Sequence, residues 1–250
     1  MSDQPAWERS RLRIHQTLAR DLGMAILGGE YKPGDSLEGE IERAGELGVS
    51  RTAYREALRI LTAKGLLESR PKAGTRVCAR ERWNLLDPEV LGWMFAGEPD
   101  AGFIQDLFEL RAVIEPAASA FAARRRTERH LKTMAEALDK MRRETLATVE
   151  GRAADQRFHH AILDAAGNEA LRVLSTSVGA AVSWTTMFKQ RGGKAPRDGT
   201  PEHLQVYKAI AAGDAEGARA AMSELLRLAL RDMGLPPARP ANSPRQATLA

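Results

Sequence analysis

The chain has 250 residues, 43% of them hydrophobic, which is enough apolar material for one large domain or two of modest size. No apolar run approaches the roughly 18 residues that a membrane-spanning helix needs. The first ten residues lack the apolar stretch of a secretory signal, so we expect a cytoplasmic protein. The single cysteine, Cys78, excludes an intrachain disulfide and a thiolate zinc cluster. A metal site would therefore need nitrogen and oxygen ligands.

The positive charge is concentrated in one segment. The chain carries 37 lysines and arginines against 33 acidic residues, a net charge of +4, yet residues 50–80 alone hold eight lysines and arginines and only two glutamates. Such a local excess on a near-neutral chain is typical of a surface that faces phosphates. An ordinary solvated face is the alternative.

The first 80 residues are expected to form three helices and a hairpin. Apolar residues recur at helical spacing over residues 7–27, and a second short helix fits residues 38–47. Ser50 is expected to cap a third helix over residues 50–64. Strands are expected at residues 66–69 and 75–78, joined by a basic loop. This order predicts a winged helix-turn-helix, and we assign residues 1–80 to a DNA-binding domain.

From residue 81 the chain becomes alanine-rich and leucine-rich, with almost no strand signal. Helices are expected at residues 88–95, 101–124, 128–146, 151–166, 169–190, 201–212 and 214–233. Short connections favour an antiparallel helical bundle, so the predicted fold class is mainly α. We assign residues 81–235 to an all-helical domain for effector binding and dimerisation. Residues 236–250, which contain four prolines counting Pro236, are expected to be a disordered tail.

The third expected helix has the pattern of a DNA-reading helix. Arg51 and Arg55 are four residues apart, so they share one face near the start of the helix. A guanidinium group there can bind a guanine or clamp a phosphate. An exposed basic helix without a nucleic-acid role is the alternative. The predicted DNA-contacting residues are Ser50, Arg51, Thr52, Tyr54 and Arg55 of the helix, with Lys72, Gly74 and Arg76 of the hairpin.

Three residues of the helical domain have the chemistry of metal ligands. Asp155 and His159 lie four residues apart on one expected helix, so both side chains project from the same face, and His203 lies on a later helix. One carboxylate and two imidazoles suit zinc, nickel or manganese, with open positions for a ligand. The alternative is that Asp155 pairs with a surface arginine, His159 is a core histidine and His203 begins a helix.

Several motifs of the first domain resemble the GntR family of transcription regulators. They are Gly29–Leu37, Leu47–Thr52, Arg55–Leu58, Gly65–Arg70 and Gly74–Thr75. The resemblance implies that Arg51 and Arg55 contact operator DNA and that the hairpin tip near Lys72 lies close to the minor groove. Members usually have an arginine that contacts DNA at the place of Ile41, and a core leucine at the place of Arg43.

The helical part resembles the FCD effector domain of the FadR subfamily over roughly residues 88–232. The resemblance implies a divalent metal, zinc or similar, that is held by an aspartate and three histidines and receives a carboxylate effector. Asp155, His159 and His203 match three of these ligands. The fourth place falls on Leu225, which cannot coordinate a metal, so a three-ligand metal site and a metal-free site both remain open.

The stretch Trp83–Trp93 is similar to the galactonate-responsive group of these regulators, which implies an aldonate effector. Arg111 would then bind its carboxylate, and Asp155, His159 and His203 its hydroxyls or a metal. We expect a homodimeric repressor of operator DNA that a sugar acid releases, with no membrane partner. Another carboxylate effector, or an architectural protein without effector, remains open. An enzyme is not expected, because no nucleophile elbow, P-loop or cofactor fingerprint occurs.

Overall fold

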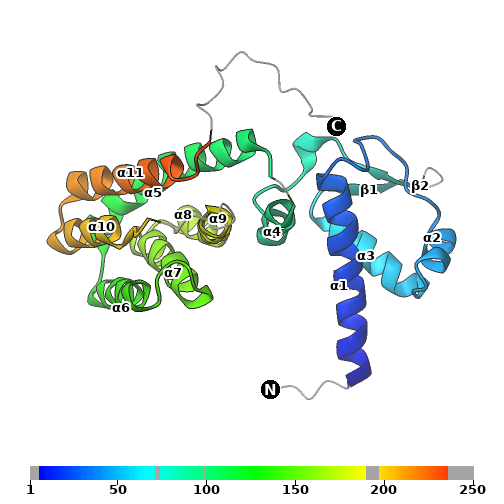
Figure 1. Cartoon of the computed structure of the whole chain (residues 1–250), viewed down its shortest axis with the longest axis horizontal. Helices are drawn as coiled ribbons and strands as arrows, with labels where there is room; N and C mark the ends of the chain where they lie inside the picture. The colour runs from blue at the N-terminus through cyan, green and yellow to red at the C-terminus, as the bar shows by residue number, and fades with distance from the viewer. Residues whose placement is uncertain (1–5, 71–73, 98, 190–196, 236–250) are drawn as a thin grey trace, which may run out of the picture. The chain divides into compact units, whose positions relative to one another are not determined.

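The computed structural model describes residues 6–70, 74–97, 99–189 and 197–235, which are mostly helical (Figure 1). These residues form two compact units that divide between residues 97 and 99. The first compact unit therefore extends beyond residue 80, where the sequence predicts the end of the first domain. The tail expected at residues 236–250 and the hairpin residue Lys72 lie outside the described residues.

The first unit is a winged helix-turn-helix. Its hairpin pairs β1 with β2 in antiparallel register, with Leu67 opposite Val77, and Ser36 adds an isolated bridge to Arg76. The mainly α fold class is confirmed. The elements of this unit are α1 (Ala6–Leu27), α2 (Glu40–Glu46), α3 (Arg51–Ala63), β1 (Leu67–Arg70), β2 (Gly74–Val77), a short 3-10 turn (Arg80–Arg82) and α4 (Pro88–Ala96).

Local sequence explains how α3 begins and ends. The Ser50 hydroxyl accepts a hydrogen bond from the Ala53 amide at 3.1 Å, which caps the first turn as expected. Gly65 follows the helix with φ 72°, and a Cβ atom at this position would lie 2.1 Å from the Arg82 carbonyl oxygen. Only glycine therefore allows the chain after the hairpin to pass so close to the end of the recognition helix.

Helix α4 belongs to the first unit because its apolar face needs cover. Val90 and Leu91 are fully buried, and α4 packs on α1. The Lys64 ammonium lies 2.8 Å from an Asp87 carboxylate oxygen and 2.7 Å from a Glu89 oxygen, which joins the end of α3 to the start of α4. These contacts explain why the first unit ends after α4 and not before it.

The second unit is an antiparallel helical bundle. In this bundle α11 packs on α5 and α10, and α7 packs on α6, α9 and α5 (Figure 1). A continuous core of alanine, leucine, methionine and valine side chains runs between these helices. The helices are α5 (Ala101–Arg125), α6 (Glu128–Glu144), α7 (Val149–Ala165), α8 (Glu169–Val173), α9 (Ser175–Lys189), α10 (Thr200–Ala212) and α11 (Ala215–Arg231).

The single helix expected over residues 169–190 is two helices, α8 and α9. The Asn168 side chain caps α8 by accepting hydrogen bonds from the amides of Ala170 and Leu171. The break follows at Leu174, where the Ser175 hydroxyl donates to the Arg172 carbonyl oxygen at 2.7 Å. This hydroxyl satisfies a carbonyl group near the end of α8, where the helical hydrogen-bond ladder is interrupted.

Two consecutive arginines bind the ends of helices in the bundle. Arg125 donates to the carbonyl oxygen of Ala166, at the end of α7, at 2.8 Å. Arg126 donates to the Ala123 oxygen at the end of α5 and to the Ala211 oxygen at the end of α10, both at 2.9 Å. Carbonyl groups at a helix C-terminus lack intrahelical donors and carry partial negative charge, so these guanidinium groups satisfy and stabilise them.

Candidate functional site

The start of α3 presents most of the predicted DNA-contacting side chains to the surface. Arg51, Thr52 and Arg55 are exposed, while the Ser50 hydroxyl is engaged in the helix cap. Tyr54 is different: its side chain is only 4% exposed and packs in the core of the first unit, where burial raises its pKa. The Tyr54 side chain therefore presents little surface to DNA, unlike its neighbours Arg51 and Arg55.

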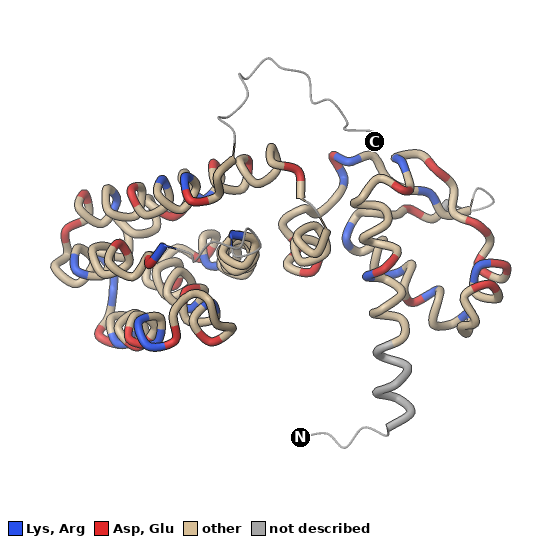
Figure 2. The backbone as a smooth tube through the Cα atoms, in the orientation of Figure 1, with Lys and Arg blue, Asp and Glu red and all other residues tan. Residues whose placement is uncertain are grey.

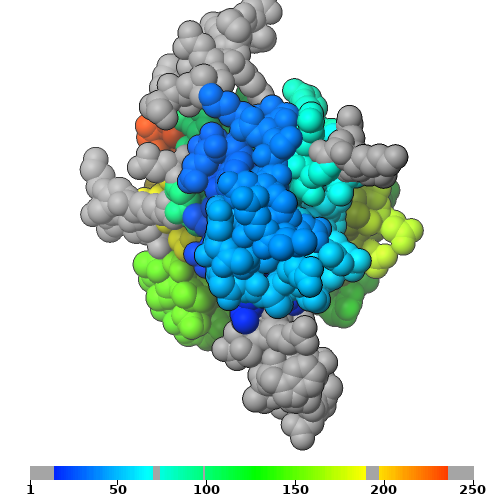
Figure 3. All heavy atoms as spheres, turned by 90° about the vertical axis from the view of Figure 1, so that its right-hand side faces the viewer, coloured from blue at the N-terminus to red at the C-terminus, as the bar shows by residue number. Residues whose placement is uncertain are grey.

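The hairpin supplies a second group of predicted residues. Gly74, with φ 76°, and Arg76 are exposed on β2. Arg76 stands opposite Glu68 in the strand register. Figure 3 shows the first unit end-on, with the light-blue residues of α2 and its neighbours in the middle of the view.

Acidic residues from outside the basic segment neutralise part of its charge. Arg55 pairs with Glu40, and Lys64 pairs with Asp87 and Glu89 (Figure 2 shows the two charges interspersed along these elements). In the described part of the chain, Arg51 and Arg76 are exposed and form no ion pair. The excess positive charge of residues 50–80 therefore lies on fewer unpaired cations than the number of lysines and arginines suggests.

Ile41 and Arg43 of α2, which depart from the pattern expected from the family resemblance, have different surroundings. Ile41 is 71% exposed. Arg43 is only partly exposed, and its Nη1 atom lies 2.7 Å from a Glu46 oxygen and 3.4 Å from a Glu38 oxygen. Its Nη2 atom also donates to the Tyr31 hydroxyl at 3.5 Å. An arginine takes the place of an expected core leucine because polar partners surround its head group at the rim of the unit.

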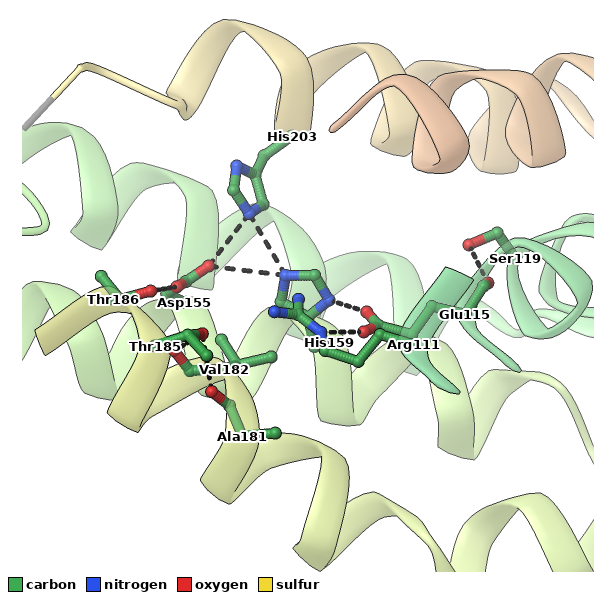
Figure 4. Close-up of polar contacts among 10 residues, drawn as sticks. All are labelled: Arg111, Glu115, Ser119, Asp155, His159, Ala181, Val182, Thr185, Thr186 and His203. Carbon is green, nitrogen blue, oxygen red and sulfur yellow. Dashed lines mark hydrogen bonds and ion pairs between the residues drawn. The ribbon is translucent and has the colours of Figure 1, made fainter. Parts of the chain in front are cut away.

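A second candidate site lies inside the helical bundle, where three helices bring five charged or titratable side chains together (Figure 4). Asp155 and His159 come from α7, His203 from α10, and Arg111 and Glu115 from α5. All five side chains are buried. Buried charged groups are costly unless they are paired or bind a cation, so this cluster is a candidate binding site.

Three ligand atoms converge at the centre of the cluster. The Nε2 atom of His203 lies 2.9 Å from Asp155 Oδ1, the Nε2 atom of His159 lies 3.5 Å from the same oxygen, and the two Nε2 atoms are 3.4 Å apart. Thr186 of α9 donates its hydroxyl to the other Asp155 oxygen at 3.3 Å. The predicted grouping of Asp155, His159 and His203 thus meets within 4.8 Å.

The outer nitrogens of both imidazoles are engaged. His203 Nδ1 lies 2.7 Å from the Gly199 carbonyl oxygen, which only accepts, so this nitrogen carries the proton. His159 Nδ1 donates in the same way to the Glu115 carboxylate. In the neutral tautomers, both Nε2 atoms then present lone pairs to Asp155, which is itself an acceptor. A metal ion or an added proton must therefore lie between them.

The charges of the cluster depend on one another. Burial alone would lower the pKa of His159, but the carboxylates of Glu115 and Asp155 outweigh it and raise this pKa to about 9. Burial alone would raise the pKa of Glu115, but Arg111 and His159 outweigh it and lower this pKa to about 2. The two histidines similarly hold the pKa of Asp155 well below its usual range, against the effect of burial.

The donor set fits a divalent metal. Asp155 Oδ1 is buried and accepts no well-aligned hydrogen bond from the described residues, although both Nε2 atoms are close to it. Imidazole nitrogens with a carboxylate oxygen are common ligands of zinc and related metals, and a second carboxylate on the outer nitrogen of one histidine is a usual support. Leu225, at the place of the fourth ligand, is buried in the apolar core.

Glu115 belongs to this candidate site but is not among the site residues expected from the sequence. Its signal was present: Glu115 follows Arg111 by four residues on one helix, and the Arg111 Nε atom donates to Glu115 Oε1 at 2.6 Å. Arg111, expected to bind an effector, is therefore already paired. His160, next to His159 in the sequence, is exposed and lines a surface pocket together with Arg129 and Arg157.

Comparisons with known proteins identify both domains. The family model "Bacterial regulatory proteins, gntR family" matches residues 14–77, and the FCD domain model matches residues 106–228. The galactonate operon transcriptional repressor of Escherichia coli (strain K12) is 33% identical over 189 residues, which are 76% of this chain and 81% of that repressor. The chain belongs to the GntR family. It is a transcription regulator with a helix-turn-helix domain for DNA and an FCD domain for a small effector.

Other relatives of this GntR regulator are also transcription regulators. Mce2R of Mycobacterium tuberculosis is 33% identical over 239 residues, covering 92% of this chain and 94% of that protein. YieP of Escherichia coli is 40% identical over 162 residues, covering 62% of this chain and 68% of that protein. The expectation that the chain is not an enzyme is confirmed by these relatives and domains. In the described part of the chain, no helix has the length and apolar character that crossing a membrane requires.

A solved structure supports the fold. The regulator Lar, described as controlling the agr system of Listeria monocytogenes, superposes with a TM-score of 0.61 and 20% identity, covering 94% of this chain and 99% of that one. At this identity the likeness concerns the fold alone.

Proposed function

We propose that this GntR-family regulator is a repressor that binds operator DNA and is released by a sugar acid of the aldonate class. The buried acceptor cluster of Asp155, His159 and His203 carries this proposal, because it needs a cation and could then bind a carboxylate or hydroxyl. The likeness to a galactonate operon repressor supports the aldonate class. Such a regulator would act in the cytoplasm.

For DNA binding, we propose that two copies of the chain form a homodimer whose winged domains read the halves of a palindrome. Arg51, Thr52 and Arg55 are exposed at the start of α3, as a recognition helix requires. The Ser50 amide and the hairpin residues Gly74 and Arg76, with Lys72 as an untested member, complete the proposed contact set. Phosphate contacts would position the protein, and base contacts would give it specificity.

For metal binding, we propose that Asp155, His159 and His203 hold one divalent ion, zinc or similar. The bound metal would supply a Lewis-acidic position for the oxygen atoms of the effector. Glu115 holds the His159 ring through Nδ1, so Nε2 points toward the ligand position. Because Leu225 supplies no ligand, the site would keep more than one position open for the effector.

The carboxylate of an aldonate also needs a cation that is not already paired. Arg111 is the residue expected from the sequence, but Glu115 accepts a hydrogen bond from it. Lys189, at the end of α9, forms no ion pair with the described residues. Burial, helped by the neighbouring Arg111, lowers the pKa of Lys189 to about 8, so an anionic ligand would be favourable there. We propose Lys189 as the unpaired effector contact, and Arg111 as a second contact through donors other than its Nε–H.

Fluorescence anisotropy on DNA from the chain's own upstream region tests this function. We expect tight binding that D-galactonate, D-gluconate or a related acid reverses, and we expect a chelator to weaken the response. Effector and DNA must weaken each other by the same factor, because coupling between two sites is reciprocal. DNA binding that no aldonate disturbs would exclude the sugar-acid class and favour another carboxylate effector.

A further inference from the structure

An ion pair joins the two helices of the helix-turn-helix. Arg55 of α3 donates its Nε–H to Glu40 Oε2 of α2, with 3.0 Å between the two atoms. The Arg55 side chain is 58% exposed and the Glu40 side chain 36% exposed. Glu40 thus lies on the surface of the same unit that carries the exposed arginines, in contact with the recognition helix.

Folding does not explain this pair. Exposed ion pairs contribute little to stability, because water screens them and two long side chains lose freedom in forming them. A carboxylate next to the DNA-facing arginines also repels phosphates, which weakens sequence-independent binding. The presence of the Glu40 carboxylate therefore favours a role in orienting the Arg55 side chain.

The geometry leaves Arg55 with a defined set of free donors. A guanidinium group has five N–H donors in one plane, and Glu40 engages only the Nε–H. The two terminal amino groups remain available, and they form the fork that binds O6 and N7 of a guanine in the major groove. The same contact restricts the side chain, so Arg55 is less able to swing toward a phosphate.

The neighbouring residue makes this role more important. Ile41 is 71% exposed and carries no charge, so α2 offers the DNA no cation at the position directly after Glu40. Arg55, whose side chain is 58% exposed, is a cation of α3 that lies beside this part of α2. Its orientation then decides whether this part of the motif reads a base or only holds the backbone.

We propose that Glu40 is a positioning residue for sequence recognition: by binding Arg55 through Nε, it directs the terminal amino groups of that arginine toward one base pair and keeps them from the phosphates. This inference rests on the proposed DNA-binding function. Glu40 does not itself contact the base. It acts through Arg55, and its loss changes selectivity more than total affinity.

The test is selection of preferred sites from a random duplex pool by the full-length protein, with wild type, Glu40→Ala and Glu40→Gln. We expect Glu40→Ala to lose the preference at one base pair in each half-site by about fivefold or more, the size of one bidentate contact. Binding to DNA without a site should stay equal or become tighter, because a repulsive charge is removed. Glu40→Gln removes the charge but keeps an acceptor, so it should retain most of the preference.

Two controls separate positioning from a structural effect. Glu56→Ala removes a carboxylate of the same unit that pairs with Arg59, 3.0 Å away, and should leave the selected sequence unchanged. In an Arg55→Ala background, Glu40→Ala should have no further effect on selectivity, because the residue it orients is gone.

The outcomes distinguish this proposal from the proposed function. If wild type and Glu40→Ala select the same sequence with the same preference, Glu40 does not position Arg55. If the preference falls equally in both backgrounds, Glu40 does not act through Arg55, and the proposal is overturned. A wild-type protein that selects no preferred sequence would overturn the operator-binding function itself.

Discussion

The imidazole of His159 donates through Nδ1 to the carboxylate of Glu115, and this bond turns its other nitrogen toward Asp155. The two residues are 44 positions apart in the sequence, on α7 and α5. Carboxylates in this position fix the tautomer and orientation of a metal-binding histidine. The orientation of the proposed metal ligand thus depends on a residue outside the ligand set.

Replacing Glu115 with glutamine should weaken metal binding. The ring of His159 would lose its charged acceptor, and loss of such a partner costs about 10- to 100-fold in metal affinity. Competition with a chromophoric chelator on the folded variant measures this change. Asp155→Ala serves as the control for loss of a ligand and should reduce binding further. Equal metal affinity in wild type and Glu115→Gln would show that Glu115 does not support the site.

The metal-free protein should be most stable in mildly acidic solution. The pKa of His159 is raised from 6.5 to about 9 in the fold, so its stabilisation is complete below 6.5 and is lost as pH rises through 9. The pKa of Glu115 is lowered from 4.5 to about 2, so its stabilisation is present above 4.5 and is lost as pH falls through 2. Thermal melting in chelator across this range measures both arms.

A variant and a metal titration test whether His159 causes the loss of stability on the alkaline side. His159→Gln should flatten the decline of melting temperature on the alkaline side. Added zinc should bind more tightly as pH rises, because the imidazoles must lose their protons to coordinate. A metal-free protein whose melting temperature rises steadily from pH 6.5 to 9 would contradict the raised pKa of His159.

Arg126→Ala should destabilise the helical unit. The substitution removes the charged donor from the partly buried carbonyl groups of Ala123 and Ala211, and loss of such hydrogen bonds costs about 1 to 3 kcal/mol. Denaturant unfolding measures the free energy. Arg124→Ala is the matched control, because Arg124 is 60% exposed and lies 4.0 Å from Glu216. Equal effects of the two substitutions would mean that the hydrogen bonds of Arg126 contribute nothing to the free energy of unfolding.

Arg51→Ala should weaken operator binding by about 1 to 3 kcal/mol, the loss of one bidentate base contact. Arg51 is exposed at the first turn of α3 and forms no ion pair with the described residues, so its guanidinium is available to DNA. Anisotropy titrations at fixed salt measure the change. Arg59→Ala, which removes a cation already paired with Glu56, should have a smaller effect. Unchanged operator affinity in Arg51→Ala would disprove the recognition-helix assignment.

Ile41→Arg should tighten binding to all DNA sequences. An added phosphate contact increases the slope of log affinity against log salt by about 1. Ile41 is 71% exposed, so the larger side chain fits without repacking. Val113→Arg provides the same charge change at a side chain of the other unit that is 74% exposed, and it should leave the slope unchanged.

The positions of most helices could be predicted because their ends are encoded locally. Ser50 caps α3, and Asp214 caps α11 through the Gly217 amide, both as their sequence positions indicate. The spacing of Asp155 and His159 likewise places both on one face of α7, since residues four apart on a helix are neighbours. Local hydrogen bonds and helical periodicity are properties of short segments, so one sequence suffices to recognise them.

Only the tertiary structure decided which residues meet across longer distances. Tyr54 lies on the same helix as Arg55, yet it packs in the core, because the rotation of α3 depends on the helices that cover it. Glu40 reaches Arg55, and Glu115 reaches His159, from separate helices. These pairs form when apolar faces pack and fix the angles between helices. The sequence alone therefore determined the family and the ligand candidates, and packing decided how each charged group is oriented and paired.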